Sequence, residues 1–188
     1  MTDTTNMPMT SRRARLTGTG GLVLLILAAV AVLEWLPVPE DTILWRELFN
    51  AGHAPLFAAI FIIFALLFML WRSRHGRSLA IEYAVAWVVT VGIGAVTELL
   101  QIFGPRDADV GDFIRDVIGA TAGLLLVHAV ILHKRHRPRW KIPLALFMTG
   151  LVLILLAVMP AVLCVRAYIE RALAFPQLAG CNSHWETW

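Results

Sequence analysis

Long apolar runs alternate with short polar connections along this chain of 188 residues. Each run is close to the ~20 residues that an α-helix needs to cross ~30 Å of hydrocarbon. Inside lipid the backbone must satisfy its own hydrogen bonds, so a helix is the economical structure for every run. The predicted transmembrane helices cover residues 20–36, 53–71, 79–103, 112–132 and 142–165. The pattern therefore predicts an all-α integral membrane protein with a bundle of about five transmembrane helices.

The composition agrees with a membrane protein. Hydrophobic residues make up 59% of the chain and charged residues only 15%, whereas a soluble domain carries about 25% charged residues. The formal net charge is +3, but the basic residues fall in short groups between the apolar runs. Such groups are typical of membrane topology and not of a nucleic-acid surface. The predicted partner is therefore the lipid bilayer, with no nucleic acid.

The basic groups predict the orientation. Eleven of the 16 Lys and Arg residues precede the first run, follow the second or follow the fourth. They are Arg12, Arg13, Arg15, Arg72, Arg74, Arg77, Lys134, Arg135, Arg137, Arg139 and Lys141. Because basic connections stay on the cytoplasmic side, the N-terminus is predicted to be cytoplasmic and the C-terminus extracytoplasmic.

Three segments outside the predicted spans have features of their own. Residues 1–19 are polar and basic and are predicted to be a disordered cytoplasmic N-terminus. Residues 39–52 are predicted to form a short amphipathic helix on the outer surface, ended by Asn50 and Gly52. Residues 166–188 form an extracytoplasmic tail, whose first residues can extend the last helix.

The two cysteines predict no metal site. Cys164 and Cys181 lack the spacing of metal ligands. A disulfide between them is not expected, because Cys164 falls within the last predicted helix.

The most polar stretch of the apolar region lies where the third predicted helix ends and the fourth begins. Ionisable groups near a membrane are costly, so they raise a functional hypothesis by default. The candidate ligand-binding residues, with a histidine that opens the second helix, are His53, Glu98, Gln101, Arg106, Asp109, Asp112, Arg115 and Asp116.

The spacing of these residues predicts where they meet. Gly94, Glu98 and Gln101 share one helix face, and so do Asp112, Asp116, Gly119 and Gly123. A short link makes the third and fourth helices antiparallel neighbours. Their polar stripes then meet at the outer end, while their glycines meet deeper. His53 lies at the same depth, so groups from three helices can converge there.

Two other interpretations of the cluster stay open. In a structural interpretation, Asp112 and Asp116 cap the fourth helix and pair with Arg106 and Arg115, while Glu98 hydrogen-bonds Gln101. In a metal interpretation, the carboxylates and the histidine hold a divalent cation as cofactor, although no dedicated ligand motif is present. No metal ligand is therefore assigned.

The chain resembles the VanZ-like family of bacterial membrane proteins over residues 53–132. The similarity rests on a histidine at a helix start, a Glu-x-x-Gln motif, a Pro-Arg turn, an aspartate pair and a glycine. In this sequence these are His53, Glu98, Gln101, Pro105, Arg106, Asp109, Asp112 and Gly119. The chain departs from the family pattern at Asp116, where the family has asparagine, and at Arg115 before it, which suggests an added ion pair.

The resemblance implies a multi-pass protein of the bacterial cytoplasmic membrane with a cell-envelope role, since the family is linked to teicoplanin resistance. Some members of that family continue into an outer domain similar to a carbohydrate-binding module, so the resemblance leaves two interpretations of the tail. It is either the start of a truncated domain of this kind or an interfacial tail anchored by Trp185 and Trp188, and we favour the interfacial tail. Three functions stay open. The first is recognition of a polar or anionic outer-leaflet ligand, such as a cell-wall precursor, glycan or glycopeptide. The second is an enzyme for lipid-linked substrates, with Glu98 or Asp112 as the catalytic acid or base. The third is a structural subunit.

Overall fold

The computed structural model describes residues 43–72, 78–103, 108–135 and 140–174, together with Gly21, Ala28, Val30 and Ala31. Over these ranges the chain is helical and has no β-strand, which confirms the all-α class. The predicted helix at residues 20–36 is described only at those four positions, each of them helical. Residues 1–19, Arg106 and Cys181 lie outside the described residues.

Four helices in the described ranges are long and apolar enough to cross a membrane. They are α2 (Ile43–Arg72), α3 (Leu79–Gln101), α4 (Val110–Arg135) and α5 (Lys141–Ala174). The shortest has 23 residues and the longest 34, so each exceeds the ~20 residues of a membrane span. Four of the predicted spans are therefore confirmed, and the chain is a multi-pass membrane protein.

The helix α2 begins ten residues before its predicted start. It runs without interruption from Ile43 through Asn50, Gly52 and Pro55, so the prediction of a separate surface helix at residues 39–52 is wrong. A glycine inside a helix costs only about 1 kcal/mol relative to alanine. Breaking the helix would leave backbone groups unpaired, at several kcal/mol each in lipid. The continuous helix is the lower-energy choice, and it buries Asn50.

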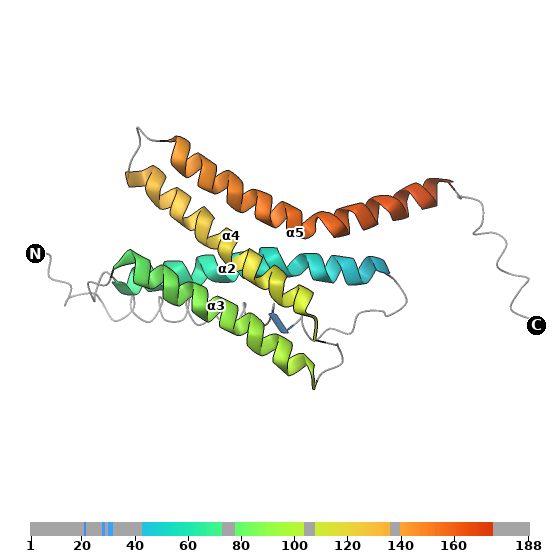
Figure 1. Ribbon diagram of the computed structural model, residues 1–188, viewed down its shortest axis with the longest axis horizontal. Coiled ribbons are helices and arrows are strands. Elements are labelled where there is room, and N and C mark those ends of the chain that lie inside the picture. The colour runs from blue at the N-terminus through green and yellow to red at the C-terminus, as the bar shows by residue number, and fades with distance from the viewer. Residues whose placement is uncertain are drawn as a thin grey trace, which may run out of the picture.

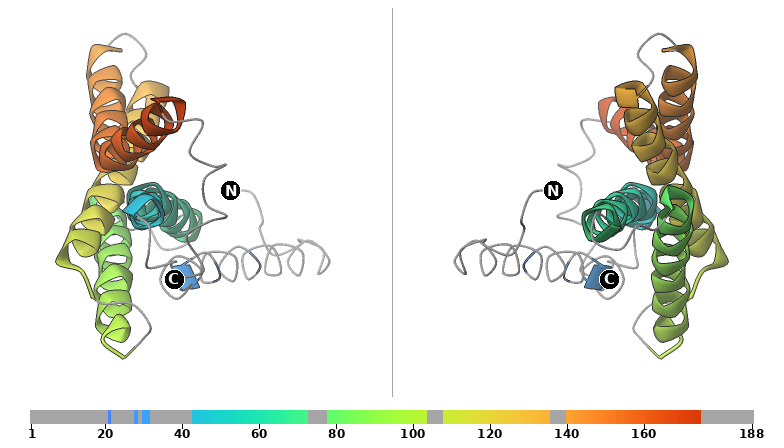
Figure 2. Two further views of the ribbon diagram at one scale, coloured as in Figure 1. Left: turned by 90° about the vertical axis from the view of Figure 1, so that its right-hand side faces the viewer. Right: turned by 90° about the vertical axis from the view of Figure 1, so that its left-hand side faces the viewer.

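The helix α2 lies at the centre of the described bundle (Figure 1) and contacts α3, α4 and α5. Its most extensive contact is with α4. Figure 2 shows α2 beside α3 and α4 in both end views, with α5 on the far side of α4 from α3. The helices α3 and α4 contact one another and run in opposite directions, as predicted from their short link.

Two glycines bring α4 close to α2. A Cβ atom on Gly119 would lie 2.9 Å from the Cα of Ala54 and closer still to its carbonyl oxygen. A Cβ atom on Gly123 would lie 2.7 Å from the carbonyl oxygen of Ala58. The small-xxx-small spacing of Gly119 and Gly123 therefore allows two helix backbones to approach closely, as is common for helices in lipid. The prediction that these glycines face the third helix is wrong, because their face also carries Asp116, which pairs with a side chain of α2.

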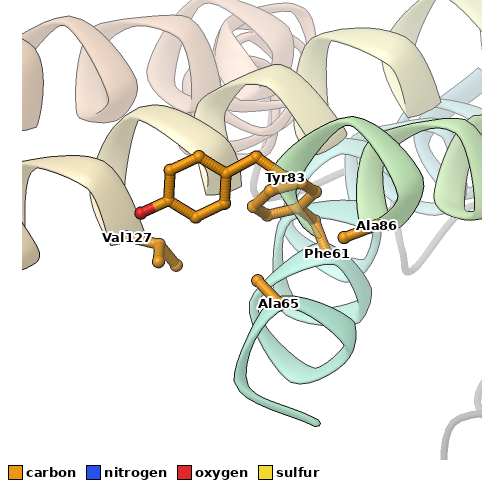
Figure 3. Close-up of a cluster of buried hydrophobic side chains, with 5 residues drawn as sticks. All are labelled: Phe61, Ala65, Tyr83, Ala86 and Val127. Atoms are coloured by element: carbon orange, nitrogen blue, oxygen red, sulfur yellow. The ribbon is translucent and has the colours of Figure 1, made fainter. Parts of the chain in front are cut away.

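An apolar cluster holds α2, α3 and α4 together in the half of the bundle away from the polar stretch (Figure 3). The buried members of this cluster are Phe61, Ala65, Tyr83, Ala86 and Val127. The helices α2 and α3 each contribute two of these residues, which lie one helical turn apart, and α4 contributes Val127. Next to the cluster, Trp87 Nε1 donates a hydrogen bond of 3.3 Å to Thr121 Oγ1. This bond joins α3 to α4.

Removing the Thr121 hydroxyl should weaken the contact between α3 and α4 slightly. We expect Thr121→Val to lower the free energy of unfolding by about 0.5–1 kcal/mol, the usual contribution of a hydrogen bond between membrane helices. Thr149→Val is the matched control, because the Thr149 hydroxyl is exposed and bonds only the Ala145 carbonyl of its own helix. Thermal unfolding in detergent measures both. Equal losses for the two variants would contradict a role for the Trp87–Thr121 bond.

The last helix, α5, continues past its predicted apolar run. It extends to Ala174, and Arg166 Nε donates to Glu170 Oε1 over 2.7 Å in this extension. The helix contains Pro160 and changes direction along its length (Figure 1), as expected where proline removes a backbone hydrogen bond. Cys164 lies inside α5, as predicted from the sequence.

Candidate functional site

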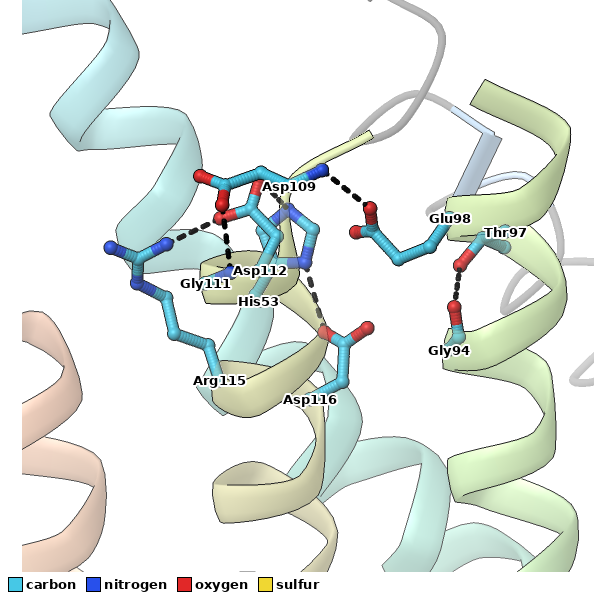
Figure 4. A network of polar contacts seen from close by, with 9 residues as sticks. All are labelled: His53, Gly94, Thr97, Glu98, Asp109, Gly111, Asp112, Arg115 and Asp116. Atoms are coloured by element: carbon cyan, nitrogen blue, oxygen red, sulfur yellow. Dashed lines mark hydrogen bonds and ion pairs between the residues drawn. The ribbon is translucent and has the colours of Figure 1, made fainter. Parts of the chain in front are cut away.

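The polar stretch gathers where α3 ends and α4 begins, against the first part of α2 (Figure 4). Three helices supply its buried side chains. His53 comes from α2, Glu98 from α3, and Asp112 and Asp116 from α4. The structure therefore brings together groups that are up to 63 positions apart in the sequence.

The His53 ring lies between two aspartates of α4. Its Nδ1 atom is 2.9 Å from Asp116 Oδ1, and its Nε2 atom is 3.6 Å from Asp112 Oδ2. Asp112 and Asp116 are one helical turn apart, so both carboxylates face the same side of α4. The side chains of His53 and Asp116 have no solvent-exposed surface. Phe57 stacks on the imidazole with its ring centroid 6.5 Å away, so the ring is also held from its own helix.

Arg115 extends this chain of contacts toward the edge of the site. Its Nη1 atom donates to Asp112 Oδ1 over 2.5 Å, and its side chain is partly exposed. The order is therefore Arg115, Asp112, His53, Asp116. The pairing of Asp112 with Arg115 in the structural interpretation is confirmed. Asp116 differs from that interpretation, because it pairs with His53 and not with an arginine.

Asp109 caps α4. Its carbonyl oxygen accepts the N–H groups of Asp112 and Phe113 at 2.9 and 3.3 Å, and its Oδ1 atom accepts the N–H of Gly111 at 2.7 Å. These bonds satisfy donors that a helix N-terminus leaves unpaired. The interpretation of Asp112 and Asp116 as the caps is wrong, because α4 begins at Val110 and both carboxylates face α2.

Glu98 joins α3 to the start of α4. Its Oε2 atom accepts the backbone N–H of Asp109 at 2.9 Å. Figure 4 shows the Glu98 carboxylate reaching from α3 toward the His53 ring and Asp109. Gln101 is buried one turn further along α3, on the same helix face as Glu98. Arg106 lies outside the described residues.

Two carboxylate oxygens of the site have no hydrogen-bond partner among the described residues. They are Glu98 Oε1 and Asp116 Oδ2, and both are buried. Asp116 Oδ2 faces α3 at Gly94, where an added Cβ atom would lie 2.7 Å from it. A buried acceptor without a donor costs about 1–3 kcal/mol. The site therefore offers acceptor oxygens, from α3 and from α4, that a donor group would satisfy.

The charges of the site are unequal. Glu98, Asp112 and Asp116 are all buried, while the neighbouring basic groups are His53 and the partly exposed Arg115. Among the described residues, no group of three His, Cys, Asp or Glu side chains is arranged to hold a metal ion. The described residues therefore give no support to the interpretation of the cluster as a metal site.

Sequence reasoning missed two contributors to the geometry. Phe57 supports the imidazole, and Ala54 gives α4 room to approach beside His53. Both are apolar residues in an apolar helix, so no chemical signal distinguishes them. Ala54 follows His53 by one residue and Phe57 follows it by four. This spacing fits any α-helix and does not indicate a binding site.

Comparison with known proteins gives one finding. A family model described as VanZ/LLP1 matches residues 35–133, which is more than half of the chain and includes every candidate site residue. No curated protein and no solved structure matches the chain.

Proposed function

The chain belongs to the VanZ/LLP1 family, and on this basis we propose that it is a cell-envelope membrane protein that binds a polar ligand through His53, Glu98, Asp112 and Asp116. The ligand reaches the site from the outer leaflet of the bacterial cytoplasmic membrane. Its chemical class is a cell-wall-related glycan, precursor or glycopeptide, with a role in teicoplanin resistance as the family link suggests.

One observation carries the proposal. Glu98 Oε1 and Asp116 Oδ2 are buried acceptors without a donor among the described residues. A ligand hydroxyl or ammonium group would donate to them and remove the cost of leaving them unpaired. Glycans, aminated sugars and glycopeptides carry many such donors, so their chemistry fits these two oxygens.

The charge balance favours a donor-rich ligand over an anion. Arg115 and Arg106 are the candidate anion-binding residues, but Arg115 already pairs with Asp112. An anion at the described site would meet the carboxylates of Glu98 and Asp116 at close range, and like charges repel strongly where water is excluded. A neutral or cationic group is therefore the better match to these side chains.

The position of the site supports access from a leaflet boundary. Glu98 lies three residues before the end of α3 at Gln101, about 4.5 Å along the helix axis at 1.5 Å per residue. Asp112 and Asp116 lie in the first two turns of α4. A headgroup or glycan that binds from this boundary would not have to cross the apolar core. The positive-inside pattern predicts that this boundary is the outer face.

Replacing Glu98 with glutamine tests the proposal. Glu98→Gln keeps the size of the side chain and turns one acceptor oxygen into an NH₂ donor, so we expect it to abolish teicoplanin protection in cells that express the protein. Glu170→Gln makes the same chemical change on the exposed extension of α5 and should leave protection intact. Membrane level and thermal unfolding are measured for both variants.

The alternatives give different results in the same assay. A structural subunit would lose protection only in proportion to its membrane level. Alanine substitutions at Glu98, Arg106 and Asp112 that keep normal levels and melting but abolish protection would exclude that function. Full protection in Glu98→Gln at normal expression would contradict the binding proposal.

A lipid-linked enzyme is the second candidate, and the His53–Asp116 contact favours it. A buried carboxylate on Nδ1 of an imidazole is an arrangement that orients histidine as a general base. Asp112, 3.6 Å from Nε2, would then be the neighbouring acid or base. Incubating the purified protein with lipid-linked precursors separates the two functions, since a binding protein leaves the precursor unchanged.

A further inference from the structure

A hollow lies between α4 and α5, at the end of the bundle opposite the His53 site. Its volume is about 320 Å³, within the range of small-ligand pockets. Figure 1 shows the end of α4 and the start of α5 side by side at the upper left, far from the α3–α4 link. The walls include Val130 from α4 and Leu144 and Phe147 from α5. These walls are apolar, so they suit a hydrocarbon chain.

The same hollow carries cationic and amphipathic residues. His133 and Lys134 line it from the last turns of α4, and Trp140 lines it just before α5. All three are exposed. Tryptophan is enriched at the level of lipid headgroups, where its ring is half in hydrocarbon and half in water. The hollow therefore combines an apolar interior with a headgroup-level cation.

The sequence around this hollow is strongly basic. Residues 134–141 contain five Lys or Arg residues and no acidic residue. Basic pockets between transmembrane helices on a cytoplasmic side attract anionic lipid headgroups at about 1 kcal/mol per Lys or Arg. A neutral metabolite would not use this charge, whereas the phosphate of a lipid would, and the apolar walls suit the acyl chain of the same molecule.

We propose that this hollow is a binding site for an anionic phospholipid. One acyl chain lies along Val130, Leu144 and Phe147, and the phosphate pairs with Lys134 beside Trp140. This site is separate from the polar cluster around His53 and does not depend on the function proposed for it. It would hold α4 and α5 together at their junction through a lipid of the same leaflet.

Native mass spectrometry of the full-length protein in detergent tests the proposal. The probes are dioleoyl phosphatidylglycerol and dioleoyl phosphatidylcholine, which have the same chains and differ in headgroup charge. We expect the wild-type protein to retain phosphatidylglycerol preferentially. Lys134→Gln should reduce this preference about fivefold. Lys141→Gln removes the same charge from an exposed residue that does not line the hollow, so it should reduce the preference less than Lys134→Gln does.

A second pair of variants tests the acyl site without changing charge. Val130→Trp fills the hollow and should reduce the retention of both lipids. Val152→Trp introduces the same ring on α5, at a residue that has the same 45% exposure but does not line the hollow. This control variant should retain both lipids as the wild-type protein does. Equal retention of the two lipids by the wild-type protein would overturn the proposal. Equal losses of preference in Lys134→Gln and Lys141→Gln would also overturn it, since attraction to a diffuse basic surface would then suffice.

Discussion

A Gly119→Ala variant should be less stable than the wild-type protein and should also lose the function of the His53 site. The added methyl group would lie 2.9 Å from the Cα of Ala54, and closer to its carbonyl oxygen, so α4 must move away from α2. Overpacking of this kind costs about 1–3 kcal/mol. Alanine gains up to about 1 kcal/mol over glycine in helix propensity. The clash outweighs this gain, because the obstacle is backbone and cannot rotate aside.

The loss of function follows from sequence adjacency. Ala54 is the neighbour of His53 in α2, and His53 Nδ1 pairs with Asp116 on the same face of α4 as Gly119. Moving the two backbones apart therefore lengthens the contact between the imidazole and the carboxylate. A larger side chain, as in Gly119→Leu, should increase both effects.

Gly92→Ala is the matched control for this prediction. Gly92 also lies inside a membrane-spanning helix, but an added Cβ atom would meet nothing within 4 Å. This variant should be neutral or stabilised by up to about 1 kcal/mol. The stability of both glycine variants is measured by thermal unfolding in detergent. Under the function proposed above, teicoplanin protection reports on the His53 site. If both variants melted alike, the close approach of α2 and α4 would not be a determinant of stability.

Much of the fold could be predicted from sequence because lipid leaves the backbone few choices. Apolar length alone predicts the spans of α3, α4 and α5. The start of α2 could not be found in this way. Asn50 and Gly52 have weak helix propensity, and their helical state depends on tertiary burial and on the cost of unpaired backbone groups in lipid.

The sequence predicts which residues gather near one another, but it does not predict which of them contact one another. Periodicity places Asp112 and Asp116 on one face of α4, and the topology predicts that His53 is near them. Which partner each carboxylate takes depends on the rotation of α4, and Gly119 fixes that rotation by allowing contact with α2. The capping role of Asp109 depends on α4 starting at Val110, two residues earlier than its apolar run suggests.

Removing the Asp116 carboxylate should have the largest effect among the polar side chains. Asp116→Ala takes away the oxygen 2.9 Å from Nδ1 of a fully buried imidazole. The buried Nδ1 atom would lose this contact, so we expect a loss of about 1–3 kcal/mol in the free energy of unfolding. Asp112→Ala should cost less, because Asp112 is 3.6 Å from the ring and already shares its charge with Arg115.

A double-mutant cycle isolates the pair from the effects of truncation. His53→Ala, Asp116→Ala and the double variant should give a coupling energy of about 1–2 kcal/mol, since the two side chains are in direct buried contact. The exposed pair Arg166 and Glu170 has a comparable distance of 2.7 Å and is the control. Its coupling should be about 0.3–0.5 kcal/mol, as for other exposed pairs one helical turn apart. A coupling for His53 and Asp116 no larger than this would mean that the contact does not hold α2 to α4.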